Sequence, residues 1–62
     1  MEEEPIFKFF SYTHLPPHLQ PTSKFFHDLA VQLIATTPRN AERTVALRKL
    51  LESKDAAVRA HV

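Results

Sequence analysis

Apolar residues recur with a helical period over two stretches of this chain, residues 22–36 and residues 38–60. Spacings of three and four residues place such positions along one side of an α-helix. In the first stretch these positions are Phe25, Phe26, Leu29, Ala30, Leu33 and Ile34. In the second stretch they are Leu47, Leu50, Leu51, Ala57 and Val58. The pattern predicts two amphipathic helices, each with one apolar stripe.

Signals at the ends of both stretches support these ranges. Thr22 or Ser23 is expected to cap the first helix, and Pro38 is expected to stop it because proline has no N–H to donate. The second helix is expected to begin at Pro38 with its preceding threonine, or at Asn40, since both suit a first turn. The polar face of the first helix then takes Lys24, His27, Asp28 and Gln32.

The residues before the helices are rich in proline and aromatic side chains. Residues 5–12 alternate only partly between apolar and polar, which predicts a short strand or extended arm against the helices or a neighbouring subunit. Residues 15–20 lie between prolines, which predicts a single helical turn with Leu15 and Leu19 inward.

We expect one all-α domain over residues 1–62, in which an arm and turn over residues 1–21 precede an antiparallel two-helix hairpin. A chain of about 60 residues buries only roughly 60% of its unfolded surface, so it is marginally stable alone. The chain has no cysteine, which excludes disulfides and thiolate zinc sites. Self-association is the remaining way to stabilise the fold, so we expect a homo-oligomer.

Neither a cofactor nor an enzyme is expected from the remaining residues. His14 and His18 have i, i+4 spacing, but two prolines separate them and no acidic or thiol partner is near, so we expect no metal site. The chain has no cysteine nucleophile, no glycine-rich phosphate loop and no paired carboxylates outside its acidic start.

The charge distribution favours a small anionic ligand. The formal net charge is +1, but residues 2–4 supply three of the seven acidic side chains, which leaves four against eight basic ones. This excess is not the clustered basic stripe that duplex DNA requires. No apolar run approaches the roughly 20 residues that span a bilayer, and the start is unlike a signal peptide. We therefore expect an intracellular protein with neither a membrane nor duplex nucleic acid as partner.

Three local patterns are candidates for ligand contacts. Lys24 follows two hydroxyl residues at a helix start, where N–H groups and the helix dipole attract anions; alternatively, it points into water. Tyr12 ends the aromatic arm and could stack on a nucleobase, or pack with its hydroxyl in water. Arg43 could bind a phosphate or base edge with two donors, or pair with a neighbouring subunit.

The pattern as a whole resembles the phage anti-CBASS sponges, small helical-hairpin proteins that bind cyclic oligonucleotides. A related hairpin occurs in one type of anti-Thoeris sponge. The resemblance covers about residues 7–60. It is carried by Tyr12, the proline-interrupted turn, the pair Ser23-Lys24, the run Glu42-Arg43-Thr44 and the run Ala57-Val58-Arg59-Ala60.

This resemblance implies a homohexamer in the cytoplasm of an infected bacterial host, where it sequesters immune second messengers without cleaving them. Cyclic dinucleotides are expected between paired protomers, in contact with Tyr12 and Lys24. Cyclic trinucleotides are expected where three protomers meet, in contact with Arg43 and Thr44. Phe26 departs from the family pattern, which has a small polar residue at that place.

Two other functions are compatible with the same residues. A structural or partner-binding phage protein would use the apolar stripe to dock another polypeptide. A small DNA-binding regulator would bind duplexes with an affinity that falls steeply with salt.

Overall fold

The computed structural model of the protein describes residues 5–62. Its elements, in chain order, are the 3-10 helices η1 (Pro5–Phe10) and η2 (Pro17–Leu19) and the α-helices α1 (Gln20–Thr36) and α2 (Ala41–Arg59). No strand occurs in the described part of the chain, which confirms the all-α class. The acidic residues 2–4, on which the charge argument partly depends, lie outside the described residues.

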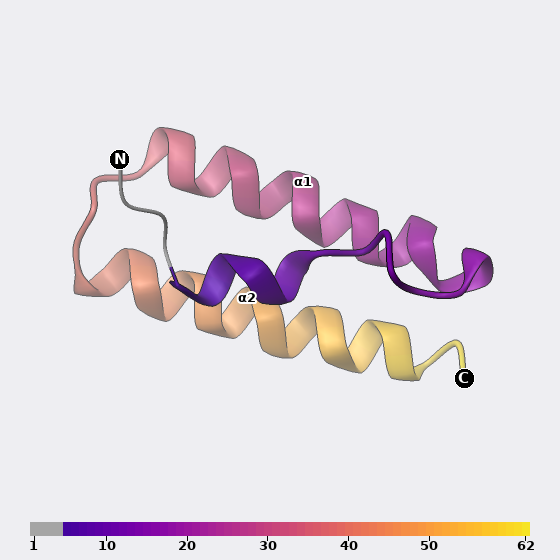
Figure 1. The fold of residues 1–62 in the computed structure, drawn as a ribbon. Helices are drawn as coiled ribbons and strands as arrows, with labels where there is room; N and C mark the ends of the chain where they lie inside the picture. The colour runs from indigo at the N-terminus through magenta and orange to yellow at the C-terminus, as the bar shows by residue number, and fades with distance from the viewer. Residues whose placement is uncertain (1–4) are drawn as a thin grey trace.

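The two long helices lie side by side and run in opposite directions, joined by residues 37–40 (Figure 1). η1 lies against both of them, and η2 leads directly into α1. The molecule is elongated, with extents of 34 × 20 × 17 Å. Within residues 5–62 no helix has both the length and the apolarity that crossing a bilayer requires.

The core takes one buried side chain from each of three elements. Phe10 of η1, Ala30 of α1 and Leu47 of α2 are fully buried and form one cluster. The half-buried residues packed against it are Ile6, Phe7, Phe26, Leu33, Ile34, Leu50 and Leu51. Burial of a side chain such as Phe10 or Leu47 contributes roughly 1.5–3 kcal/mol. The segment before the helices is therefore an integral part of the core.

The segment predicted as a strand or extended arm is a 3-10 helix, so that prediction is wrong. Pro5 fixes a φ angle that suits the first position of a helix. An extended segment would also need a partner strand for its backbone, whereas a helical one forms its hydrogen bonds locally. At the end of η1, the Nζ atom of Lys54 donates to the carbonyl oxygen of Phe9 at 2.8 Å.

The turn at the prolines has the predicted form. Pro17 begins η2, Leu19 is buried and Leu15 is half-buried. The side chain of Gln20 stabilises this turn, because its Nε2 donates a hydrogen bond to the carbonyl oxygen of Leu15 at 2.8 Å.

The predicted start of the first helix is wrong by two residues. α1 begins at Gln20 rather than at 22, and neither Thr22 nor Ser23 is its N-cap. Because η2 runs straight into α1, the N–H of Gln20 already donates to the carbonyl oxygen of Pro17, and no side-chain cap forms. Ser23 is instead fully buried, and Thr22 contacts Nε2 of His61 at 3.1 Å.

The second helix begins at the later of its two predicted starts. The side chain of Asn40 accepts a hydrogen bond from the N–H of Arg43 at 3.0 Å, which is N-cap geometry. Pro38 stands before the helix, so α2 spans 41–59 rather than 38–60.

The apolar stripe of α1 is only partly covered. Ala30 is fully buried as expected, but Phe25 is 73% exposed and Leu29 is 47% exposed, so their predicted burial is wrong. The elements that α1 contacts are α2 and the two short helices η1 and η2, and they leave part of this stripe uncovered. The stripe of α2 is as predicted: Leu47 is buried and the other four members are half-buried.

Candidate ligand site

A cavity of about 320 Å³ lies where η1 and the segment after it pass the first half of α1. It is lined by Phe7, Lys8, Ser11, Tyr12, Thr13 and His27. Its volume is at the lower end of the roughly 300–1,000 Å³ that small-molecule sites occupy. Tyr12, one of the residues predicted to bind ligand, is therefore half-buried in a cavity wall.

Two aromatic rings flank the imidazole of His27 in this wall. Its centroid lies 5.5 Å from the Phe7 ring and 5.2 Å from the Tyr12 ring, the latter in an edge-on arrangement at 65°. His27 was expected on the solvent-facing side of the helix, and that prediction is wrong because η1 brings Phe7 onto it. A helical period alone could not reveal this neighbour, since the two residues are far apart in sequence.

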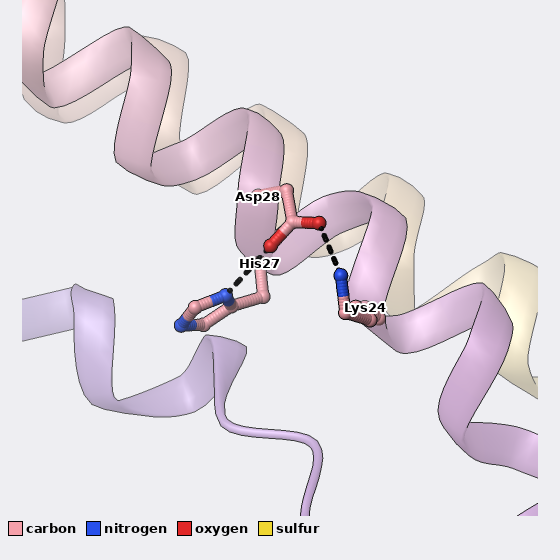
Figure 2. A network of polar contacts seen from close by, with 3 residues as sticks. All are labelled: Lys24, His27 and Asp28. Carbon is pink, nitrogen blue, oxygen red and sulfur yellow. Dashed lines mark hydrogen bonds and ion pairs between the residues drawn. The ribbon is translucent and has the colours of Figure 1, made fainter.

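Asp28 links Lys24 and His27 on the surface of α1 (Figure 2). Its Oδ2 accepts a hydrogen bond from Nζ of Lys24 at 2.8 Å, and its Oδ1 lies 3.2 Å from Nδ1 of His27. The hydrogen bond from Lys24, and then the contact with His27, lower the pKa of Asp28. The same hydrogen bond is the main cause that raises the pKa of Lys24. The carboxylate of Asp28 thus supplies the negative charge that a lysine near a helix start requires.

Tyr12 and Lys24, the two residues predicted to bind a cyclic dinucleotide, are therefore connected through two others. The chain of contacts runs from the Tyr12 ring to His27, from His27 to Asp28, and from Asp28 to Lys24. The Tyr12 hydroxyl also contributes slightly to the raised pKa of Lys24. Sequence patterns indicated Tyr12 and Lys24 as ligand contacts and did not indicate that His27 and Asp28 connect them.

Arg43 has an intramolecular role that the sequence did not indicate. It is only 7% exposed, and one guanidinium nitrogen donates to the carbonyl oxygens of Ile34 and Thr37 at 3.2 Å each. These carbonyls belong to the last turn of α1 and the residue after it, where a cation also matches the helix dipole. Thr44 is half-buried, and its N–H donates to the carbonyl oxygen of Asn40 at 3.3 Å.

The two predicted pairs of ligand-binding residues lie toward opposite ends of α1. Ile34, the partner of Arg43, comes ten residues after Lys24, which corresponds to about 15 Å along the helix axis. A single small ligand bound to one chain cannot contact both pairs.

A second hollow of about 500 Å³ lies between η1 and α2. Its charged lining residues are Lys8, Arg48, Glu52 and Asp55, so the two signs balance. An anionic ligand gains little net attraction there. The cavity at Tyr12 is the better candidate because Lys8 lines it and no acidic side chain does.

Comparison with known proteins gives no related protein whose site could be set beside this one. No protein-family model, no curated protein and no solved structure matches the chain. Among residues 5–62, the acidic and imidazole side chains form no group of three that could hold a metal ion.

Proposed function

We propose that this protein binds and sequesters cyclic oligonucleotide second messengers and does not cleave them. Cyclic dinucleotides bind at the cavity of Tyr12, and cyclic trinucleotides bind at a separate site that includes Arg43 and Thr44. The protein acts in the cytoplasm of an infected bacterial host and blocks a defence system there, as the resemblance to anti-CBASS sponges implies. The observation that carries the proposal is the combination of three rings and a lysine in one cavity.

This combination matches the two recognition needs of a nucleotide. Stacking of a base on an aromatic side chain contributes roughly 1–3 kcal/mol, and Tyr12 offers such a ring. Lys8 in the lining, and Lys24, which Asp28 connects to His27, are donors for a phosphate. The raised pKa of Lys24 keeps that side chain charged throughout the physiological pH range.

A complete site requires a second copy of the chain. The cavity is small for a molecule with two nucleotides, so we propose that two protomers face each other and each holds one half of the ligand. A two-fold interface presents every donor twice, which matches the near two-fold symmetry of a cyclic dinucleotide. The homohexamer contains three such pairs, and the exposed Phe25 and Leu29 support self-association because they form an uncovered apolar surface.

The direct test is titration calorimetry with cyclic dinucleotides. Tyr12→Ala and Lys24→Ala are each expected to weaken binding by roughly 1–3 kcal/mol. Lys49→Ala is the matched control, because it removes an exposed lysine of α2 that lines neither cavity. Equal binding by all three variants would refute the site.

The second candidate is a structural or partner-binding phage protein. The exposure of Phe25 and Leu29 favours it as well, since another polypeptide could cover them. This function predicts a stable hetero-complex and no thermal stabilisation by cyclic nucleotides.

A further inference from the structure

The imidazole of His27 has one nitrogen engaged and one available. Nδ1 lies 3.2 Å from Oδ1 of Asp28, and Figure 2 shows the second nitrogen on the edge of the ring that points away from Asp28. Among residues 5–62, no group forms a hydrogen bond with Nε2 of His27. This nitrogen belongs to a side chain that lines the cavity of Tyr12.

Asp28 decides which of the two nitrogens carries the proton. An ionised carboxylate only accepts hydrogen bonds, and its other oxygen already accepts from Lys24. Nδ1 of His27 must therefore be the donor in the contact with Asp28. A neutral imidazole has a single N–H, so Nε2 is left with a lone pair.

We propose that Nε2 of His27 accepts a hydrogen bond from an N–H group of the bound ligand, namely an amine or ring N–H at the edge of a nucleobase. Asp28 is the residue that positions His27 for this contact. The inference rests on the proposed function and adds a determinant of base specificity to it.

The other polar side chains of the cavity cannot distinguish a ligand N–H group from a ligand carbonyl. Lys8 only donates, and the hydroxyls of Ser11, Tyr12 and Thr13 can both donate and accept. With its Nδ1–H engaged by Asp28, the neutral imidazole of His27 offers the cavity an acceptor and no donor. A base edge that presents an N–H to it gains a hydrogen bond, and an edge that presents a carbonyl leaves two acceptors facing each other.

The charged and titratable groups around His27 come from three segments. They are Lys24 and Asp28 of α1, Lys8 of η1, and Tyr12 of the segment after η1. Protonation of His27 would convert Nε2 into a donor and reverse its preference. The test is therefore made near pH 8.

The first measurement reads the tautomer by long-range ¹H–¹⁵N NMR of the intact protein without ligand. The expected result is the form with the proton on Nδ1. Asp28→Ala should shift the population toward the form with the proton on Nε2. Lys24→Ala, which removes the other contact of the same carboxylate, should leave the tautomer unchanged. A wild-type protein with the proton on Nε2 would overturn the inference.

The second measurement repeats the spectrum with cyclic di-AMP, cyclic di-GMP and the mixed cyclic GMP–AMP. With a ligand that binds, the Nε2 resonance should move to lower frequency, and His27→Phe should weaken binding about 5-fold through loss of one hydrogen bond. If His27→Phe binds with full affinity and circular dichroism shows a native fold, the inference is overturned and the proposed function still stands. If none of the three probes binds the wild-type protein, the proposed function fails and the inference fails with it, whatever the tautomer.

Discussion

Nζ of Lys54 donates a hydrogen bond to the carbonyl oxygen of Phe9 at 2.8 Å, across 45 residues of chain. Lys54 is only 8% exposed, so the aliphatic part of this side chain packs in the interior while its ammonium holds the end of η1 on α2. The next residue, Phe10, is fully buried in the core. Phe7, whose ring centroid lies 5.5 Å from that of His27, belongs to the same short helix, so the attachment of η1 bears on the candidate site.

Lys54→Met tests this attachment. The substitution keeps most of the aliphatic volume and removes the donor, which leaves a partly buried carbonyl without its partner. We expect a loss of about 1–3 kcal/mol in the free energy of unfolding, measured by chemical denaturation. Lys49→Met, at an exposed position of α2, is the control and should change stability by less than about 0.5 kcal/mol. Equal stability of both variants would show that the hydrogen bond does not hold η1.

The two long helices were predictable from sequence because their signals are local. The helical period, the Asn40 cap and the proline turn each depend on residues within a few positions of one another. The position of η1 on α2 depends on the contact between Phe9 and Lys54, which are 45 residues apart and meet only in the folded chain. His27 was assigned to the wrong face for the same reason, because its neighbour Phe7 comes from a separate element. Sequence also indicated no partner for Arg43 within the chain.

Arg43 is expected to serve both stability and the trinucleotide site. Arg43→Ala removes the donor to the carbonyls of Ile34 and Thr37, so it should destabilise the fold by about 1–3 kcal/mol. At temperatures well below unfolding, the variant should lose cyclic trinucleotide binding and keep cyclic dinucleotide binding. Arg48→Ala, an exposed arginine of α2, is the control.

Calorimetry with both ligand classes, together with light scattering, separates the two roles of Arg43. If both ligands are lost together, or if the oligomer dissociates, Arg43 is an assembly residue and the model with two kinds of site is wrong.

The contacts of Asp28 predict how stability depends on pH. Because the folded-state pKa of Asp28 lies below its ordinary value of 3.8, its contribution is present above that value and is lost as pH falls through the folded-state pKa. The raised pKa of Lys24 gives a contribution that is present below 10.5 and is lost at higher pH.

Denaturation of the wild-type protein and of Asp28→Asn between pH 2 and pH 7 measures the first of these effects. The wild-type protein should be the more stable near neutral pH, and the difference should diminish in acid. A difference that stays constant over this range would contradict a role for the ionised carboxylate. The effect should be small because Lys24 and Asp28 are about half exposed to solvent.

The exposed stripe of α1 predicts the assembly. The wild-type protein should show several times its chain mass of 7.1 kDa by light scattering at micromolar concentration. Phe25→Asp combined with Leu29→Asp should lower that mass, because burial of an unpaired carboxylate costs several kcal/mol. Both positions are exposed within one chain, so helix content should persist. Val45→Asp, at an exposed apolar position of α2, is the control; equal effects of both changes would exclude this surface as the specific interface.

The most direct test of the central claim follows a cyclic dinucleotide through binding and release. The purified protein is mixed with ligand, separated from free ligand by size-exclusion chromatography, denatured, and the released molecules are analysed by mass spectrometry. Sequestration predicts that ligand elutes with the protein and is recovered as the intact cyclic molecule, and that Tyr12→Ala carries much less of it. Ligand that stays entirely in the free fraction, or a linear product after denaturation, would contradict the account.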